Sequence, residues 1–330
     1  MSTSFPSRPG NGRQRGVALI TAVLIVALAT ILAIQVGFNG YLDQRRGATA
    51  FALDQGFQVA VGAEAWAADI LAQDRKQQSK TSPIDDFTEA WATPIPPIPL
   101  ENGEVQGQLE DMTGRFNLNS LLKRDEAGKL VKDPAAAQRL QRLLGLIDLE
   151  EKWASVIVDF IDSDVETDGA DGAEDSAYSS LTPAYRTPNM PITRSSELLA
   201  IAGFGLDRYR KLEPFVTALP IGVPINLCTA PLEVLDALRE GNREWSVAKK
   251  TNTDARKQRC FPTIEDFKNS LKTDEERKEL FGEQKVLAQT SSYFRASIWV
   301  TIGTTQFTLY SLLKRDHTQV RPILRSFGTP

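Results

Sequence analysis

Histidine, cysteine and methionine are scarce in this 330-residue chain, which contains one, two and three of them. The single histidine, His317, and two cysteines are too few for the usual zinc sites or for a Cys–His catalytic pair. The chain also lacks the G-x-S-x-G, H-E-x-x-H and phosphate-loop motifs of common hydrolases and nucleotide enzymes. The sequence therefore predicts that the protein is not an enzyme.

An excess of basic residues is also missing, because the formal net charge is −4. Phosphate binding needs a concentrated basic face, so the balance argues against nucleic acid as the main partner. One basic run lies late in the chain, and we interpret it as a solvated surface; it consists of Lys249, Lys250, Arg256, Lys257 and Arg259.

Long apolar runs are absent except for one near the N-terminus. Residues 17–38 contain no charge and would form a helix about 33 Å long, enough to cross a hydrocarbon core of about 30 Å. A cleaved secretory signal is the alternative, but its apolar region is usually about 7–15 residues and ends in a small-residue site. Arg8, Arg13 and Arg15 precede the run, which predicts a cytoplasmic N-terminus. We therefore expect a retained single-pass anchor.

Helical character continues beyond the apolar run through an amphipathic part, residues 39–75. Its apolar stripe recurs every three or four positions, at Ala48, Phe51, Ala52, Gln55, Val59, Gly62, Ala63, Trp66 and Ile70. No proline occurs between Pro9 and Pro83, so one helix of roughly 80 Å could run from Val17 to about Ala72. Two helices hinged near residues 37–40 are the alternative.

The remaining chain changes period twice. Residues 76–103 are proline-rich and predict an extended linker, and alternation predicts strands at 104–110, 293–302, 306–313 and 320–327. The long segment between the first two strands is helical, with Asp133, Thr229, Thr263 and Thr273 as expected caps and a capping box from Asp148 to Glu151. We expect an α+β fold: a long N-terminal helix on an antiparallel sheet formed by residues 76–125 and 285–330, with an all-α domain of helical hairpins, residues 126–284, inserted in the sheet.

The most chemically distinctive segment is an acidic loop, residues 159–175. Eight carboxylates fall within it, and a subset of them is expected to bind Ca²⁺; they are Asp159, Asp162, Asp164, Glu166, Asp168, Asp171, Glu174 and Asp175. Residues 164–175 approximate an EF-hand loop, but Glu166 and Asp175 depart from its pattern and prolines follow where the exiting helix should grow. The alternatives are a solvated loop without an ion and paired carboxylates for acid–base catalysis.

Two further features leave alternatives open. If the region after the membrane segment is outside the cytoplasm, Cys228 and Cys260 should form a disulfide, which would contribute about 3–4 kcal/mol in the chain-entropy model; two buried thiols are the alternative. Residues 224–235 resemble the second half of a DNA-binding helix-hairpin-helix, with residues 195–212 as an earlier hairpin. Because residues 219–238 contain no lysine or arginine, we interpret the pattern as a helical hairpin that supports the fold and does not bind DNA. The alternative is a membrane-anchored module that binds a partner through the helix-hairpin-helix.

The junction Arg15-Gly16-Val17 resembles type IV pilin signals, in which a peptidase cuts after the glycine. Together with FNLNSL, FIDSD…DGAEDSAY, PINLCTAPLEVL and SSYFRASIWVTIG, in that order, it makes the whole chain similar to the K-type minor pseudopilins of type II secretion, the general secretion pathway protein K family. The resemblance implies removal of a leader, residues 1–16, by the prepilin peptidase and N-methylation of Val17. It also implies calcium binding in the acidic loop.

The same resemblance implies a location and partners. The protein would sit in the inner membrane of a Gram-negative bacterium with a periplasmic head, and then at the tip of a pseudopilus. Its partners would be the I, J and H minor pseudopilins, through them the major pseudopilin, and also secreted exoproteins. Members of the wider pilin group usually have a glutamate at the fifth mature position, where this chain has Thr21. That glutamate can neutralise the N-terminal amine of the subunit above, so Thr21 is expected to suit a subunit with nothing above it.

Overall fold

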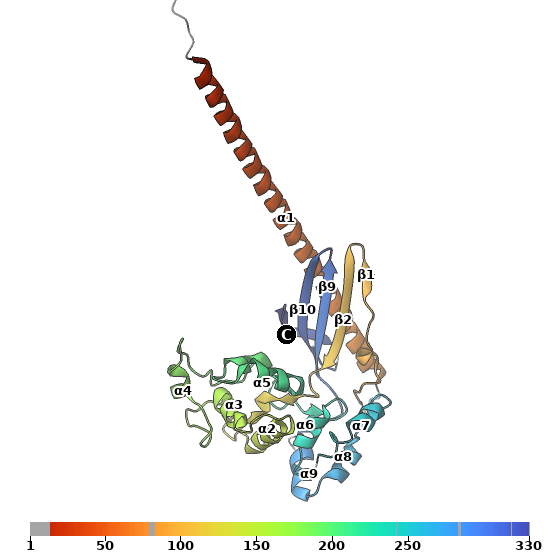
Figure 1. Ribbon diagram of the computed structural model, residues 1–330. Helices are drawn as coiled ribbons and strands as arrows, with labels where there is room; N and C mark the ends of the chain where they lie inside the picture. Colours follow the sequence, from red (N-terminus) through yellow and green to blue (C-terminus); the bar gives the residue numbers. More distant parts are fainter. Residues whose placement is uncertain (1–13, 79–82, 242, 283–284, 318, 330) are drawn as a thin grey trace, which may run out of the picture.

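The structure is a computed structural model that describes residues 14–78, 83–241, 243–282, 285–317 and 319–329. A single helix, α1 (Gln14–Gln77), extends 64 residues without a break, so the continuous helix is confirmed and the hinge near residues 37–40 is wrong. Its N-terminal half projects away from the head (Figure 1). The large apolar side chains between Val17 and Phe38 are each more than half exposed, and the helix is long and apolar enough to cross a membrane. Most of the expected leader, residues 1–13, lies outside the described residues.

The C-terminal half of α1 packs against one face of the sheet. Ala60 and Leu71 are fully buried in that contact, and Gly56 faces Phe307 of the sheet so closely that an added Cβ would lie 3.1 Å from the Phe307 Cβ. The stripe expected from the sequence is therefore only partly correct. Ala52, Val59, Ala63 and Ile70 pack on the sheet core, whereas Phe51 and Trp66 are 72% and 46% exposed.

The sheet has five antiparallel strands in the order β1-β2-β9-β10-β11. Their bounds are β1 Ile98–Leu100, β2 Gly103–Asp111, β9 Tyr293–Ile302, β10 Thr305–Arg315 and β11 Val320–Phe327. Four of these strands were expected, and β1 lies within the proline-rich segment as a short edge strand, where proline is tolerated. Alternate residues of β9 face α1, led by Phe294, Ile298 and Val300, which are at most 2% exposed.

Residues 112–292 form an insertion between β2 and β9, which are neighbours in the sheet. At its base the Met112 amide donates to the Tyr293 carbonyl (2.9 Å). The insertion is wider than the expected 126–284, because Phe116, Leu122 and Leu287 belong to its hydrophobic core. The expected α+β fold class is confirmed, and Figure 1 shows the insertion at the end of the head opposite the projecting helix.

The insertion consists of short helices and short two-stranded ladders. Its helices are α2 Pro134–Leu146, α3 Trp153–Ile161, α4 Asp175–Ser179, α5 Gly205–Leu212, α6 Leu232–Ala237, α7 Lys249–Arg256, α8 Ile264–Ser270 and α9 Asp274–Phe281. The 3₁₀ turns of the chain are η1 Ala90–Ala92, η2 Leu118–Leu121, η3 Ser195–Ala200 and η4 Glu213–Phe215. Three ladders, which the sequence patterns did not indicate, pair β3 Phe116–Asn117 with β6 Val216–Thr217, β4 Leu122–Arg124 with β5 Leu130–Lys132, and β7 Ile225–Asn226 with β8 Leu287–Ala288.

The helix caps test the local sequence signals one by one. Asp133 caps α2 through the Ala135 amide (3.1 Å), and Thr263 and Thr273 form capping boxes at α8 and α9 as expected. The expected box at Asp148 is wrong, because Asp148 has a φ of +56° and α3 begins only at Trp153. Thr229 is not a cap either: α6 begins after Pro231, and the Thr229 hydroxyl donates to Asp111 of β2 instead.

Alternating charges join the insertion to the sheet. Arg295 of β9 lies 2.7 Å from Glu110 of β2 and 3.4 Å from Glu213 of η4, and Arg115 reaches the same two acids at 3.5 and 3.1 Å. All four side chains are partly or largely buried, so water screens the attraction between their charges less than it would at an exposed surface. This ring of charges holds the end of β2 against the inserted domain.

Cys228 and Cys260 form the expected disulfide, with their Cα atoms 4.7 Å apart. Arg256 lies beside it and is buried, donating to the carbonyls of Leu227, Ala230 and Phe261. Burial lowers the pKa of Arg256 to about 10. The expectation of a wholly solvated basic run is therefore wrong for Arg256, whereas the side chains of Lys249, Lys250, Lys257 and Arg259 are exposed.

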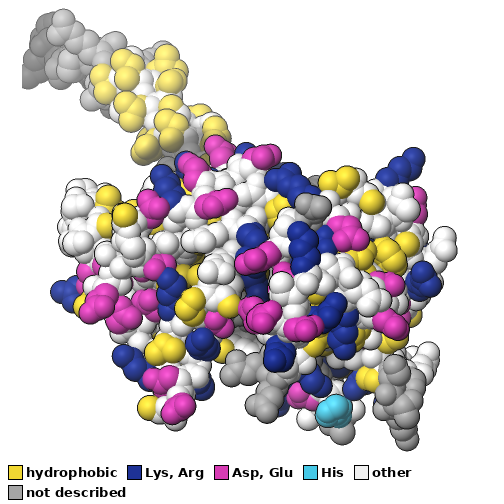
Figure 2. Space-filling view, turned by 90° about the horizontal axis from the view of Figure 1, so that it is seen from below, with side chains coloured by type: hydrophobic (Ala, Val, Ile, Leu, Met, Phe, Trp, Pro, Cys, Tyr) yellow, Lys and Arg dark blue, Asp and Glu magenta, His cyan; other side chains and the backbone are white. Residues whose placement is uncertain are grey.

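The apolar residues of the helix-hairpin-helix pattern are buried in the hydrophobic core. Leu232, Val234 and Leu235 of α6 are at most 4% exposed and pack in the large core of the insertion. The structural interpretation of this pattern therefore agrees with the burial. Figure 2 shows charges of both signs spread over the head, while hydrophobic side chains gather on the projecting helix.

Candidate cation site

Three carboxylates of the acidic loop converge. Asp162 directly follows α3, Glu174 precedes α4, and Asp164 lies between them in the chain. One carboxylate oxygen from each falls within 4.8 Å of the other two. Asp162 and Glu174 are only 4% and 5% exposed. The fold thus brings together acids that lie up to twelve positions apart in the chain.

The buried oxygens of this group have no hydrogen-bond donors. Among the described residues, none donates to either carboxylate oxygen of Glu174 or to Oδ1 of Asp162. Burial, followed by repulsion from the neighbouring carboxylates, raises the pKa of Glu174 to about 7 and that of Asp162 to about 6. Buried carboxylates without donors are costly, and a hard divalent cation would satisfy them with the oxygen ligands that it prefers.

Three other acids hold the loop rather than face the group. Asp159 is fully buried and accepts from the amides of Asp168 (2.9 Å) and Ala173 (2.7 Å), while burial raises its pKa. Asp168 pairs with Lys132 of β5, and Asp175 accepts from the Thr187 amide (3.1 Å). These contacts fold the loop back on itself so that Asp162 and Glu174 meet.

Gly172 is the residue that lets the loop close. A Cβ at this position would overlap a carboxylate oxygen of Asp159 and the amide of Asp168. The remaining two predicted ligands, Glu166 and Asp171, are exposed and lie outside the converging group. The EF-hand spacing therefore does not describe the geometry. Asp164 at its first position joins the group, but the acids at its third, fifth and twelfth positions lie outside the group, and Glu174 joins it from a position where the pattern has no ligand.

Asn189 is a polar residue near the group that the sequence patterns did not indicate. Its amide donates to the Asp164 carbonyl (3.1 Å), and its own oxygen is buried without a donor among the described residues. Asn189 has a φ of +48°, a conformation that asparagine tolerates better than most residues. No spacing rule could have linked it to Asp164, because the contact depends on how two loops pack.

A second group of acids, Asp74, Asp85 and Glu89, lies where α1 ends. Here a cation is already supplied by the protein, since Arg315 pairs with Asp74 (2.8 Å) and with Asp85. Glu89 accepts from the Trp91 indole (2.7 Å). We interpret this group as a buried structural network that fixes the end of α1 to β10.

The residues predicted to govern processing lie in the first turns of α1. Gly16 and Val17 are helical and exposed. The Thr21 hydroxyl donates within its own helix, to the carbonyls of Val17 (3.1 Å) and Ala18 (3.0 Å). Thr21 therefore presents no unsatisfied hydroxyl proton to the surroundings of the helix, unlike a carboxylate at the same position.

Comparisons with known proteins identify the family. The family model described as "Type II secretion system (T2SS), protein K" matches residues 114–221. The chain is 33% identical over 326 residues to the type II secretion system protein K of Pseudomonas aeruginosa, covering 96% of this chain and 93% of that relative. The chain belongs to the type II secretion system protein K family.

Other members of the protein K family agree. The chain is 31% identical to the protein K of Pectobacterium carotovorum subsp. carotovorum, covering 96% of this chain and 97% of the relative. The crystal structure of the GspK-GspI-GspJ complex from enterotoxigenic Escherichia coli contains a similar chain, with a TM-score of 0.73, 24% identity, and coverage of 86% of this chain and 100% of that one. The resemblance drawn from the sequence is therefore confirmed, and the chain is a minor pseudopilin of type II secretion.

Proposed function

We propose that this protein K forms the tip of the periplasmic pseudopilus and, from there, supports the export of folded exoproteins through the outer membrane. The observation that carries the proposal is the opposite placement of its two largest features (Figure 1). The exposed apolar half of α1 can pack into a filament core, while the inserted domain occupies the far end of the head. A domain of that size would leave no room for another subunit above it.

The proposed partners are the I, J and H minor pseudopilins and, through them, the major pseudopilin. The similar solved structure is a complex of GspK, GspI and GspJ, which supports the first two. The exported proteins are further proposed partners, and nucleic acid is not. In this role the chain contributes surfaces and no catalysis.

A tip position can be tested by labelling the head on isolated pseudopili. We expect gold-conjugated antibodies against the inserted domain to mark one end of each filament. Antibodies against the major pseudopilin should mark the whole length and serve as the control. Labelling of the inserted domain along the length would contradict the proposal.

The proposed location is the inner membrane of a Gram-negative bacterium, with the N-terminus in the cytoplasm and the head in the periplasm. The disulfide between Cys228 and Cys260 supports an oxidising compartment for the head. The prepilin peptidase is proposed to cut between Gly16 and Val17 and to methylate Val17. Mass spectrometry of the mature protein should find N-methylvaline at its start, and an uncut or differently cut N-terminus would contradict this processing.

Thr21 is proposed to suit the tip because a subunit there gains no partner for a buried carboxylate. Thr21→Glu would place an acid in the apolar half of α1, where an unpaired carboxylate costs several kcal/mol. We expect the variant to lower tip assembly and secretion, whereas Thr21→Ser should preserve both. Normal secretion by Thr21→Glu, with the subunit distributed along pseudopili, would contradict the assignment.

Calcium is proposed as the bound ion, with Asp162, Asp164 and Glu174 among its ligands. Supporting this, Glu174 and Asp162 present buried oxygens without donors, and the acidic loop supplies enough further oxygens for a flexible six- to eight-fold site. In the apo protein, repulsion among the three acids would loosen the loop between α3 and α4. The ion would then act structurally, by holding that part of the inserted domain in one shape.

A further inference from the structure

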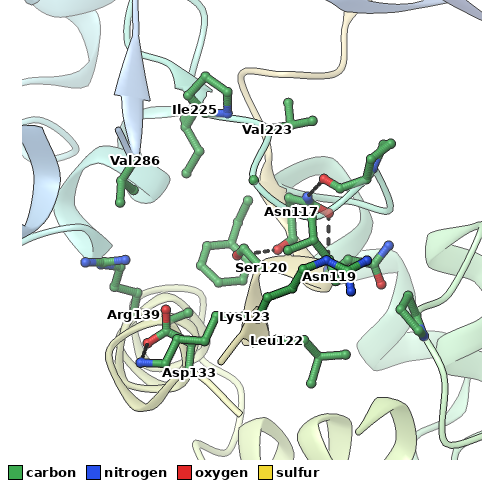
Figure 3. A pocket seen from close by; sticks show the side chains of 18 of the residues that line it. Asn117, Asn119, Ser120, Leu122, Lys123, Asp133, Arg139, Val223, Ile225 and Val286 are labelled. Atoms are coloured by element: carbon green, nitrogen blue, oxygen red, sulfur yellow. Dashed lines mark hydrogen bonds and ion pairs between the residues drawn. The ribbon is translucent and has the colours of Figure 1, made fainter. Parts of the chain in front are cut away.

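The inserted domain contains a large cavity that shares no residue with the candidate cation site. It has a volume of about 810 Å³, within the roughly 300–1,000 Å³ typical of ligand pockets. Its walls come from the β4–β5 ladder, the start of α2, the loop 220–225 and the segment before β8. Figure 3 shows Ile225 and Val286 on one side of the open space and Leu122 and Lys123 on the other.

The charges around this cavity are of mainly one sign. Four basic side chains line it, Lys123, Arg124, Arg139 and Lys285, against one acidic side chain, Asp133, among the described residues. This is unusual in a chain whose net charge is −4. A concave site lined by one sign of charge concentrates ligands of the opposite sign.

Two of the four basic side chains pair with an acidic side chain, and two do not. Arg139 is 5% exposed and pairs with Glu279, and Lys123 lies 3.7 Å from Asp133. Arg124 and Lys285 are exposed, and in the described part of the chain no acidic side chain lies within ion-pair distance of either. Arg124 donates one hydrogen bond, to the Gly128 carbonyl (3.0 Å), which leaves its charge unpaired. Their charges are therefore available to a ligand at the rim.

The floor between these charges is mostly apolar. Leu130, Ile221, Val223 and Val286 line it and are only half-buried, so apolar surface remains open to a ligand. Asn117 and Asn119 also line the cavity, but both are buried and hydrogen-bonded within the protein. A ligand must therefore offer carboxylates to the rim and apolar side chains to the floor. Inorganic anions satisfy only the first requirement.

We propose that this cavity is a docking site for an acidic, apolar peptide segment of another protein. Aspartate or glutamate side chains of the segment would pair with Arg124 and Lys285, and its leucine-like side chains would cover the half-buried Ile221 and Val286. The site lies in the inserted domain, which Figure 1 places farthest from the projecting half of α1, so a partner approaching the head from that end could reach it. The proposal does not depend on the position of the subunit in a pseudopilus.

The test measures peptide binding to the full chain in uncharged detergent micelles by fluorescence anisotropy. The probe is a labelled heptapeptide with blocked ends in which aspartate alternates with leucine, and the comparison peptides replace aspartate with asparagine or leucine with serine. We expect the acidic, apolar peptide to bind at least about tenfold more tightly than either, since each charged contact can change affinity by about that factor.

Two matched double variants distinguish binding at this cavity from non-specific electrostatic attraction to the protein. Arg124→Glu/Lys285→Glu should weaken binding by about tenfold or more, because both side chains are exposed and their reversal leaves the core intact. Lys211→Glu/Lys250→Glu makes the same charge change at exposed positions that do not line the cavity, and it should leave affinity unchanged. Equal loss in both pairs, no loss in the first pair, or no preference for the acidic peptide would overturn the proposal. Unchanged tryptophan fluorescence would verify the fold of each variant.

Discussion

Arg325 of β11 donates two hydrogen bonds to Glu64 of α1, from Nε to Oε2 (2.8 Å) and from Nη2 to Oε1 (2.7 Å). Glu64 is 4% exposed, whereas Arg325 reaches it from the surface. Burial raises the pKa of Glu64, but its hydrogen bonds and its attraction to Arg325 outweigh that effect, so the net pKa is lowered. The pair joins the last strand of the sheet to α1, the helix that is long and apolar enough to cross a membrane.

Glu64→Gln should lower the free energy of unfolding by about 1–3 kcal/mol, because it breaks a two-point ionic contact at a buried position. Since the pKa of Glu64 is lowered in the folded protein, its stabilisation should be present above about pH 4.5 and decline as the pH falls. Urea unfolding followed by tryptophan fluorescence would measure both effects, because all five tryptophans follow the apolar half of α1 in the chain. Glu101→Gln, at an exposed turn, is the matched control and should change little.

Removal of a converging acid should abolish the response to calcium. We expect Ca²⁺ to raise the melting temperature of the wild-type protein, and Glu174→Gln and Asp162→Asn to remove most of that rise. Asp171→Asn removes a carboxylate from the same loop outside the group and should retain the full rise. If EDTA leaves the wild-type melting curve unchanged and elemental analysis finds no calcium, the site does not bind this ion.

Two glycines of α1 should respond in opposite ways to the same change. Gly56→Ala gains about 1 kcal/mol of helix propensity but places a methyl group 3.1 Å from the Phe307 Cβ. An overpacking cost of about 1–3 kcal/mol should outweigh that gain, so we expect stability to fall by up to about 2 kcal/mol. Gly62→Ala meets nothing within 4 Å and should raise it by about 0.5–1 kcal/mol through helix propensity. Thermal unfolding of both variants would show the difference, and a gain in both would mean that α1 does not pack this closely on the sheet.

Ionisation of Glu89 should lower the free energy of unfolding as the pH rises from about 4.5 to about 7. Burial raises its pKa to about 7, while the Trp91 indole opposes the shift and Asp74 and Asp85 add to it. The folded protein therefore holds a proton that the unfolded chain loses near pH 4.5, so this stabilisation is complete below that value and is lost as the pH rises through about 7.

Glu89→Gln imitates the protonated form and isolates this contribution. Its free energy of unfolding should match the wild type near pH 4.5 and exceed it at about pH 8, above the raised pKa. Glu126→Gln, at an exposed turn, should follow the wild type at both pH values. A parallel pH dependence of Glu89→Gln and the wild type would show that Glu89 is ionised throughout.

Periodic elements were predictable from the sequence because their burial repeats along the chain. The 64-residue α1 and the strands β9, β10 and β11 each carry such a repeat over eight residues or more. The caps at Asp133, Thr263 and Thr273 were also correct, since each depends only on neighbouring residues. Asp148 and Thr229 have the same local signals but failed, because tertiary contacts use them differently; Thr229 bonds to Asp111, which is 118 positions away.

The candidate cation site was predictable as a region but not as a set of ligands. Charge density marked residues 159–175, yet which acids converge depends on how Asp159, Asp168 and Asp175 anchor the loop to distant partners such as Lys132 and Thr187. The ladders β3–β6 and β7–β8 were missed for a similar reason. Each has two residues per strand, which is too few for an alternation of apolar and polar residues to be recognised in the sequence.

The adjacency of β2 and β9 has an evolutionary consequence. The insertion leaves and re-enters the sheet through two paired strands, so its ends are as close as those of a hairpin turn. Lineages could lengthen, shorten or replace the domain without shifting the register of any strand, much as a hairpin tolerates different loops. Natural selection could thus reshape the inserted domain to suit its surroundings while α1 and the five-stranded sheet stayed unchanged.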